Sequence, residues 1–231
     1  MTAATLAATE PRSSNRDIAR ALAVVGALML WNQLSDLRAE HFHTDAQPVL
    51  SLGRLSGIAF GALVTIGGVV GLGCVAWGRR SLRELGWTTR GRTIPLFGLG
   101  VALTALVVGL VFAAYAGLAG LDGVRGLADA IASLPLDRRV FFLVMGAKVA
   151  FVEETVFRGD LLKSLSARTG PVVAIVASSV AFALYHRSLD PVPLGMKLLF
   201  GLVFATAAVR TRSLWPSLIA HTGMWAIVAD N

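Results

Sequence analysis

Two adjacent glutamates and an arginine lie inside an otherwise apolar stretch of this chain, Phe151-Val-Glu-Glu-Thr-Val-Phe-Arg-Gly-Asp160. Glu154 and Arg158 are four residues apart, so on a helix they share one face and can form an ion pair. Glu153 is rotated from Glu154 by about 100° on the same helix. The spacing therefore predicts one glutamate paired with the arginine and a second, Glu153, that is free to act as a general base.

Two histidines in the C-terminal half could meet these carboxylates. His186 ends an apolar segment, and His221 follows Pro216 within the last apolar segment. Taken singly, His186 is typical of a membrane-interface residue and His221 of a buried hydrogen-bonding histidine. Two glutamates, one arginine and two histidines from three separate segments instead indicate a shared functional site, because ionisable groups at membrane depth are costly.

The predicted depths of these residues agree only in part. At a rise of 1.5 Å per residue, Glu153 lies about 15 Å and His221 about 12 Å from the cytoplasmic ends of their helices. The same calculation places His186 at about 22 Å, which is deeper than the other two. The sequence thus predicts that Glu153 and His221 meet, and requires a tilted or late-starting helix to bring His186 to them.

Membrane helices are the elements that must position these side chains. Of the 231 residues 55% are hydrophobic and 15% charged, with a mean hydropathy of +0.68, whereas soluble domains usually carry about 25% charged residues. We therefore predict an all-α, polytopic transmembrane helical bundle with about seven spans and no soluble domain. The predicted spans are 18–34, 55–77, 94–119, 139–162, 171–186, 192–209 and 213–229, with a short interfacial helix at 124–134.

The charges predict orientation and exclude one class of partner. Lys and Arg are more frequent on the side that holds the N-terminus, so the positive-inside rule predicts an integral, multi-pass protein of the plasma (cytoplasmic) membrane with a cytoplasmic N-terminus. The net charge of +7 comes from basic residues that flank the spans and face anionic lipid, so no nucleic-acid partner is predicted. Oligomeric state is not readable.

We predict three regions along the chain. Residues 1–16 form a disordered cytoplasmic tail, 17–134 form the N-terminal helices with their connectors, and 135–231 form the catalytic core.

The polar residues resemble the signature of the CPBP intramembrane proteases, a family that includes CAAX prenyl proteases and bacteriocin-immunity (ABI) proteins. That signature is EExxxR, then FxxxH, then a histidine motif usually written HxxxN. The first two motifs match in full, and the similarity covers residues 140–225. The matching residues are Glu153, Glu154 and Arg158 in the first motif, Phe182 and His186 in the second, and His221 in the third.

The resemblance implies hydrolysis of peptide bonds within the lipid bilayer, on a membrane-embedded or lipidated peptide or protein. In this scheme Glu153 activates a water together with His186, Glu154 pairs with Arg158 to shape the site, and His221 steadies the oxyanion. The preferred interpretation requires no cofactor. Members of the family are also labelled metallopeptidases, and by residue type Glu153, His186 and His221 could hold Zn²⁺. A metal-free glutamate mechanism and a zinc mechanism both stay open on the sequence.

One position departs from the family pattern. Trp225 stands where the family often carries an asparagine that is thought to hold the oxyanion, and an indole N–H replaces an amide only in part. This departure favours an alternative, a catalytically weak member that acts as an immunity or scaffold protein in the membrane. An ion-coupled transporter that uses the carboxylates as a relay is a further alternative, which the absence of an internal repeat disfavours.

Overall fold

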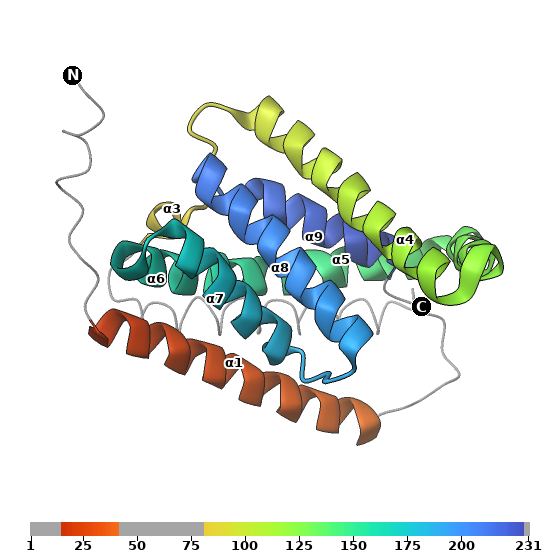
Figure 1. The fold of residues 1–231 in the computed structure, drawn as a ribbon, viewed down its shortest axis with the longest axis horizontal. Coiled ribbons are helices and arrows are strands. Elements are labelled where there is room, and N and C mark those ends of the chain that lie inside the picture. Colours follow the sequence, from red (N-terminus) through yellow and green to blue (C-terminus); the bar gives the residue numbers. More distant parts are fainter. Residues whose placement is uncertain (1–14, 42–80, 229–231) are drawn as a thin grey trace.

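The computed structural model describes residues 15–41 and 81–228, and every regular element in these two ranges is a helix (Figure 1). The prediction of an all-helical chain is confirmed for this part of the molecule. The elements are α1 (Asn15–His41), α3 (Leu82–Leu85), α4 (Thr93–Ser133), α5 (Leu136–Glu153), the π-helix η2 (Glu154–Leu161), α6 (Leu162–Thr169), α7 (Pro171–Tyr185), α8 (Pro191–Thr211) and α9 (Trp215–Val228).

The predicted spans correspond to helices wherever the structure describes them. Two helices in the described ranges, α4 and α8, are long and apolar enough to cross a membrane, and α7 is apolar but shorter. The span predicted at 55–77 and residues 1–14 of the predicted tail lie outside the described residues. The predicted spans 18–34, 94–119, 171–186, 192–209 and 213–229 fall in α1, α4, α7, α8 and α9.

Helix α4 is interrupted once along its 41 residues. Gly120 has φ 66° and ψ −165°, a conformation that glycine adopts without the steric penalty of a side chain. The helical ladder therefore breaks there, and the residues beyond it form a separate piece that ends at Ser133. This piece contains the segment 124–134 that the sequence predicted as a short helix apart from the span.

The helix that carries the two glutamates is longer than predicted, and this added length removes the predicted difference in depth between Glu153 and His186. The sequence predicted a span over 139–162, but α5, η2 and α6 run without a break from Leu136 to Thr169. Gly170, with φ 82°, then reverses the chain, and Pro171 begins α7. Glu153 lies 17 residues before Gly170 and His186 lies 16 residues after it. The two arms of this hairpin thus bring both residues to one level, and the calculated depth mismatch was wrong.

Small residues bring α9 to the centre of the bundle, where it contacts both α4 and α5 (Figure 1). A Cβ atom added at Gly100 would lie 2.7 Å from Ile219, and one added at Gly223 would lie 2.6 Å from Thr104. Backbones approach closely at such positions, as is common between membrane helices. The result is that the helix carrying His221 is held tightly against α4.

Candidate active site

The helix that bears the glutamates changes type at the site. Helix α5 ends at Glu153, and the next eight residues, Glu154–Leu161, form a π-helix in which every residue is buried. A π-helix bonds i to i+5, so each residue turns the chain through a smaller angle than in an α-helix. Successive side chains are consequently separated by a smaller angle around the helix axis. Both glutamates are buried inside the bundle. Single π turns within longer helices occur frequently at functional sites.

Contacts from the segment before α4 support this turn. The Thr155 hydroxyl donates to the Phe151 carbonyl at 2.6 Å and accepts from the Trp87 indole N–H at 3.0 Å. A Cβ atom at Gly159 would lie 2.9 Å from the Leu85 carbonyl oxygen, so only glycine lets the α3 turn pack there. The π-helix is thus held from outside by residues far away in the sequence.

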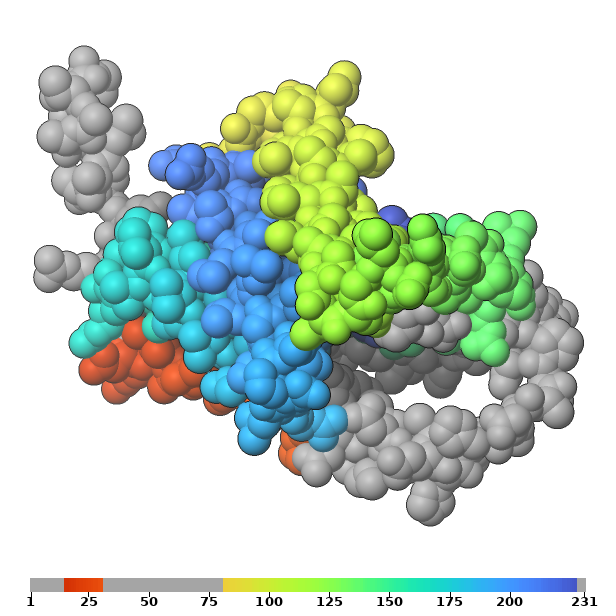
Figure 2. All heavy atoms as spheres, turned by 45° about the vertical axis from the view of Figure 1, so that its right-hand side comes forward, coloured from red at the N-terminus to blue at the C-terminus, as the bar shows by residue number. Residues whose placement is uncertain are grey.

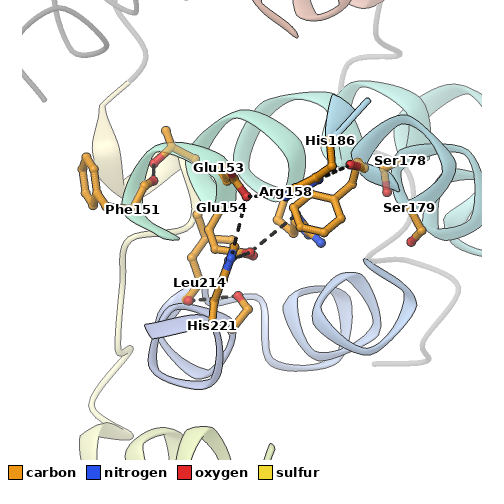
Figure 3. A network of polar contacts seen from close by, with 12 residues as sticks. Phe151, Glu153, Glu154, Arg158, Ser178, Ser179, His186, Leu214 and His221 are labelled. Carbon is orange, nitrogen blue, oxygen red and sulfur yellow. Dashed lines mark hydrogen bonds and ion pairs between the residues drawn. The ribbon is translucent and has the colours of Figure 1, made fainter. Parts of the chain in front are cut away.

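The ion pair predicted between Glu154 and Arg158 is present. The Arg158 Nη1 and Glu154 Oε1 atoms are 3.4 Å apart, and both side chains are fully buried (Figure 3). His221 Nδ1 lies 3.2 Å from the same carboxylate oxygen. The Arg158 guanidinium also lies 4.1 Å from the centre of the Phe182 ring, a cation–π contact. With two polar partners, Glu154 is placed to orient His221 and to balance the charge of Arg158.

Glu153 faces both histidines. Its Oε2 atom is 3.8 Å from His221 Nε2 and 3.9 Å from His186 Nε2 (Figure 3). Among the described residues this oxygen is buried and accepts no hydrogen bond. His221 contacts both carboxylates, Glu153 through Nε2 and Glu154 through Nδ1.

The hydrogen bonds of the two imidazoles determine which nitrogen faces Glu153. His186 Nδ1 is 2.8 Å from the Phe182 carbonyl oxygen, and a carbonyl only accepts, so Nδ1 carries a proton. His221 Nδ1 faces the Glu154 carboxylate and carries a proton for the same reason. When either ring is neutral, its Nε2 therefore presents a lone pair to Glu153. Two acceptor nitrogens thus face the same carboxylate oxygen of Glu153.

A water molecule matches this set of acceptors. Separations of 3.8 and 3.9 Å are too long for direct hydrogen bonds, which are about 2.7–3.2 Å. For a water oxygen about 2.8 Å from both atoms of such a pair, the angle between the two hydrogen bonds is about 90°, close to the H–O–H angle of water. His186 keeps 21% of its side chain exposed and His221 only 2%, so the site is reached from the side of His186.

A metal ion is the other species that three acceptors could hold. Two imidazoles and one carboxylate are a known donor set for zinc, and Glu153, His186 and His221 are the residues that would supply it. Within residues 15–41 and 81–228, however, no group of three or more His, Cys, Asp or Glu side chains is arranged to hold a metal ion. The residues fit zinc by type and not by arrangement, so no step is derived through a metal.

Two charged residues near the site were not recognised in the sequence. Asp160 is fully buried in the π-helix and pairs with Arg20 of α1 at 3.3 Å. Lys197 of α8 interacts electrostatically with both Glu153 and His186. Its position three and seven residues before Phe200 and Phe204 was the available signal, because that spacing places it on their face.

Trp225 is accommodated by a glycine in the facing helix. A Cβ atom at Gly146 would lie 2.4 Å from the Trp225 Cβ and 3.0 Å from its Cγ. The indole therefore packs directly against the backbone of α5, about two turns before the glutamates. The large side chain at this position is thus matched by local packing in α5.

Replacing Gly146 with alanine is expected to destabilise the fold by about 1–3 kcal/mol, because the added methyl would overlap Trp225. The matched control is Gly195→Ala in α8, where nothing lies within 4 Å of an added Cβ. That control is expected to change stability by less than about 1 kcal/mol. The measurement is the midpoint of denaturant-induced unfolding in detergent micelles. Equal midpoints for the two variants would contradict the packing described.

Comparison with known proteins supports the resemblance that the motifs indicated. Residues 135–227 match the model of a family described as Rce1-like, Type II CAAX prenyl endopeptidase Rce1-like. The matched region contains α5, η2 and α6 to α8 and nearly all of α9, and with them the glutamates, Arg158 and both histidines. No curated protein and no solved structure matches the chain. The family match and the two long apolar helices together indicate a membrane protein.

Proposed function

We propose that this chain, whose residues 135–227 match the model of the Rce1-like family of CAAX prenyl endopeptidases, hydrolyses peptide bonds of membrane-embedded or lipidated substrates. Glu153 is the base that activates the water. The observation that supports this most is the convergence of the Glu153 carboxylate and two imidazole Nε2 atoms at 3.8 and 3.9 Å. Such a set of acceptors orients a water and receives its proton.

Each residue has a separate part in the proposed reaction. The water gives one hydrogen bond to Glu153 Oε2 and the other to His186 Nε2, and its oxygen attacks the carbonyl carbon as Glu153 takes the proton. The carbonyl π electrons move to oxygen. When the His221 ring carries a proton on each nitrogen, Nδ1 bonds Glu154 and Nε2 donates to that oxygen. The carbon–nitrogen bond then breaks, and the leaving amine takes the proton from Glu153.

The substrate follows from the family and from the surroundings of the site. The family description names prenylated CAAX proteins at the level of the whole family. For this chain we propose a peptide or protein that is held in the bilayer by a lipid group or by its own apolar segment. The catalytic site lies among helices, two of which are long enough to cross the membrane, so a soluble substrate without such a group would not reach it.

The proposal is tested with the purified protein in lipid vesicles. A C-terminally prenylated peptide and an apolar, non-prenylated transmembrane peptide are incubated with it, and the products are identified by mass spectrometry. We expect cleavage of at least one peptide by the unaltered chain and none by the variant Glu153→Gln/His186→Ala/His221→Ala. Activity is expected to survive a strong chelator. If the chelator abolishes activity and zinc restores it, the metal-free mechanism is wrong. If neither peptide is cleaved, the proposal that this chain is a peptidase is wrong.

Trp225 supports a second candidate, an immunity or scaffold protein that binds a partner in the membrane. The side chain that occupies this position is packed against Gly146 and carries no amide. In cells, a protective or scaffolding phenotype that survives the same triple variant would favour this function over hydrolysis.

A further inference from the structure

Lys197 lies on the face of α8 that is turned toward the catalytic centre. Phe200, Gly201 and Phe204 follow it at i+3, i+4 and i+7, the positions that share one helix face. Phe204 stacks on the His221 ring with centres 5.4 Å apart. A Cβ atom at Gly201 would lie 2.9 Å from the Ser179 Cβ in α7. This face of α8 therefore contacts both helices that carry the histidines.

The register of α7 and α8 brings Lys197 near His186. The two helices are antiparallel neighbours that cross where Gly201 meets Ser179. From that crossing, His186 lies about 10 Å along α7 and Lys197 about 6 Å along α8, in the same direction. Consistent with this placement, Lys197 interacts electrostatically with His186 and with Glu153.

A groove beside the site is lined by Lys197 as its single charged residue. It has a volume of about 330 Å³ and lies between α4, α8 and α9, where the surfaces of α4 and α8 adjoin (Figure 2). Apolar side chains such as Tyr115, Phe200 and Met224 make up most of its lining, and Trp225 belongs to it as well. The groove is thus apolar and presents one cation, Lys197, whose charge acts on Glu153.

The amine of Lys197 is left available as a hydrogen-bond donor. In the described part of the chain, its Nζ has no hydrogen bond and no ion pair. Arg158, the other cation near Glu153, is already paired with Glu154 and covered by the Phe182 ring. The carboxylate of Glu153 and the Nε2 atoms of the neutral histidines only accept hydrogen bonds. A free donor for developing negative charge is therefore scarce at this centre, and Lys197 can supply one.

We propose that Lys197 is a catalytic residue that donates from Nζ to the scissile carbonyl oxygen as the oxyanion forms, as a second donor beside His221. The inference rests on the hydrolysis proposed above. Lys197 keeps all its protons: the water proton goes to Glu153, the carbonyl π electrons go to oxygen, and the amine leaves with the proton from Glu153. A fixed cation acts most strongly on charge that appears only in the transition state.

The test compares Lys197→Met with Lys148→Met in lipid vesicles, using whichever membrane peptide the unaltered chain cleaves. Lys148 is also half-buried, but it belongs to α5 and does not line the groove. Lys197→Met is expected to lower kcat by about 10²–10³-fold with KM changed less than about threefold. Lys148→Met is expected to keep kcat within about twofold, since it removes a half-buried charge that does not line the groove.

A tetrahedral anion provides a second readout. A phosphonate that replaces the scissile amide of the same peptide is expected to inhibit Lys197→Gln more weakly than the unaltered chain, by the factor lost in kcat/KM. The unfolding midpoint of Lys197→Met reveals whether that variant folds. If it does not fold, Lys197→Gln takes its place in the test. A raised KM with unchanged kcat, or equal inhibition of both proteins, would overturn the role of Lys197 alone. Absence of cleavage by the unaltered chain would instead overturn the proposed function and this inference together.

Discussion

Replacing Glu153 with glutamine is expected to lower the rate of peptide cleavage by about 10²–10⁴-fold, the contribution typical of a general base. Glutamine has the same shape as glutamate, but its amide does not take a proton from water. The carboxylate oxygen that it replaces is buried and faces two imidazole nitrogens at 3.8 and 3.9 Å. The initial rate of product formation in lipid vesicles is the measurement.

The fold of this variant is expected to be retained, because Glu153 Oε2 makes no hydrogen bond in the described part of the chain. Its unfolding midpoint in detergent should equal that of the unaltered chain within experimental scatter. The control is Asp122→Asn, which neutralises a side chain that is 95% exposed and far from the site in the sequence. It should leave the rate unchanged. Cleavage by Glu153→Gln at the rate of this control would remove Glu153 from the mechanism.

Replacing Arg158 with leucine is expected to destabilise the protein by about 3–5 kcal/mol, the usual cost of leaving one member of a buried ion pair alone. Arg158 and Glu154 are both fully buried and 3.4 Å apart. Without the guanidinium, the Glu154 carboxylate would have His221 as its nearest charged or ionisable partner. The measurement is the free energy of unfolding in detergent micelles.

The double variant Glu154→Gln/Arg158→Leu separates charge from packing. It removes the unpaired carboxylate as well, so it is expected to recover most of the stability that Arg158→Leu loses. Its cleavage rate should nevertheless stay low, because the hydrogen bond that orients His221 is weakened. If the single and double variants are equally unstable, the guanidinium acts through its contact with Phe182 and not through its charge.

The helices and the polar set were predictable because they depend on local patterns. Apolar runs locate α7, α8 and α9, and the part of α4 before Gly120, to within a few residues. A separation of four residues is enough to predict the Glu154–Arg158 pair. The end of the glutamate helix was misplaced, because Lys163 and Arg168 look like the start of a loop. They belong to α6, which continues to Gly170. Polarity marks the edge of the apolar region and not the end of the helix.

The π-helix could not be predicted, because its supports come from elsewhere in the chain. Trp87 and Leu85 contact it across more than sixty intervening residues, and nothing within Glu154–Leu161 itself specifies i→i+5 bonds. An ideal α-helix was therefore assumed, with about 100° between the two glutamates. In the structure both carboxylates contact His221, through its two ring nitrogens.

Insertions and deletions should be tolerated unequally around the site because of the turn at Gly170. Glu153 and His186 meet because the two arms between them are of nearly equal length. One added residue in either arm would turn its end by about 100° and shift it by about 1.5 Å. The connection from His186 to Pro191 lies outside the two arms, and its length does not affect their register. The chain is therefore free to change length in the connection 187–190 and constrained in length between Glu153 and His186.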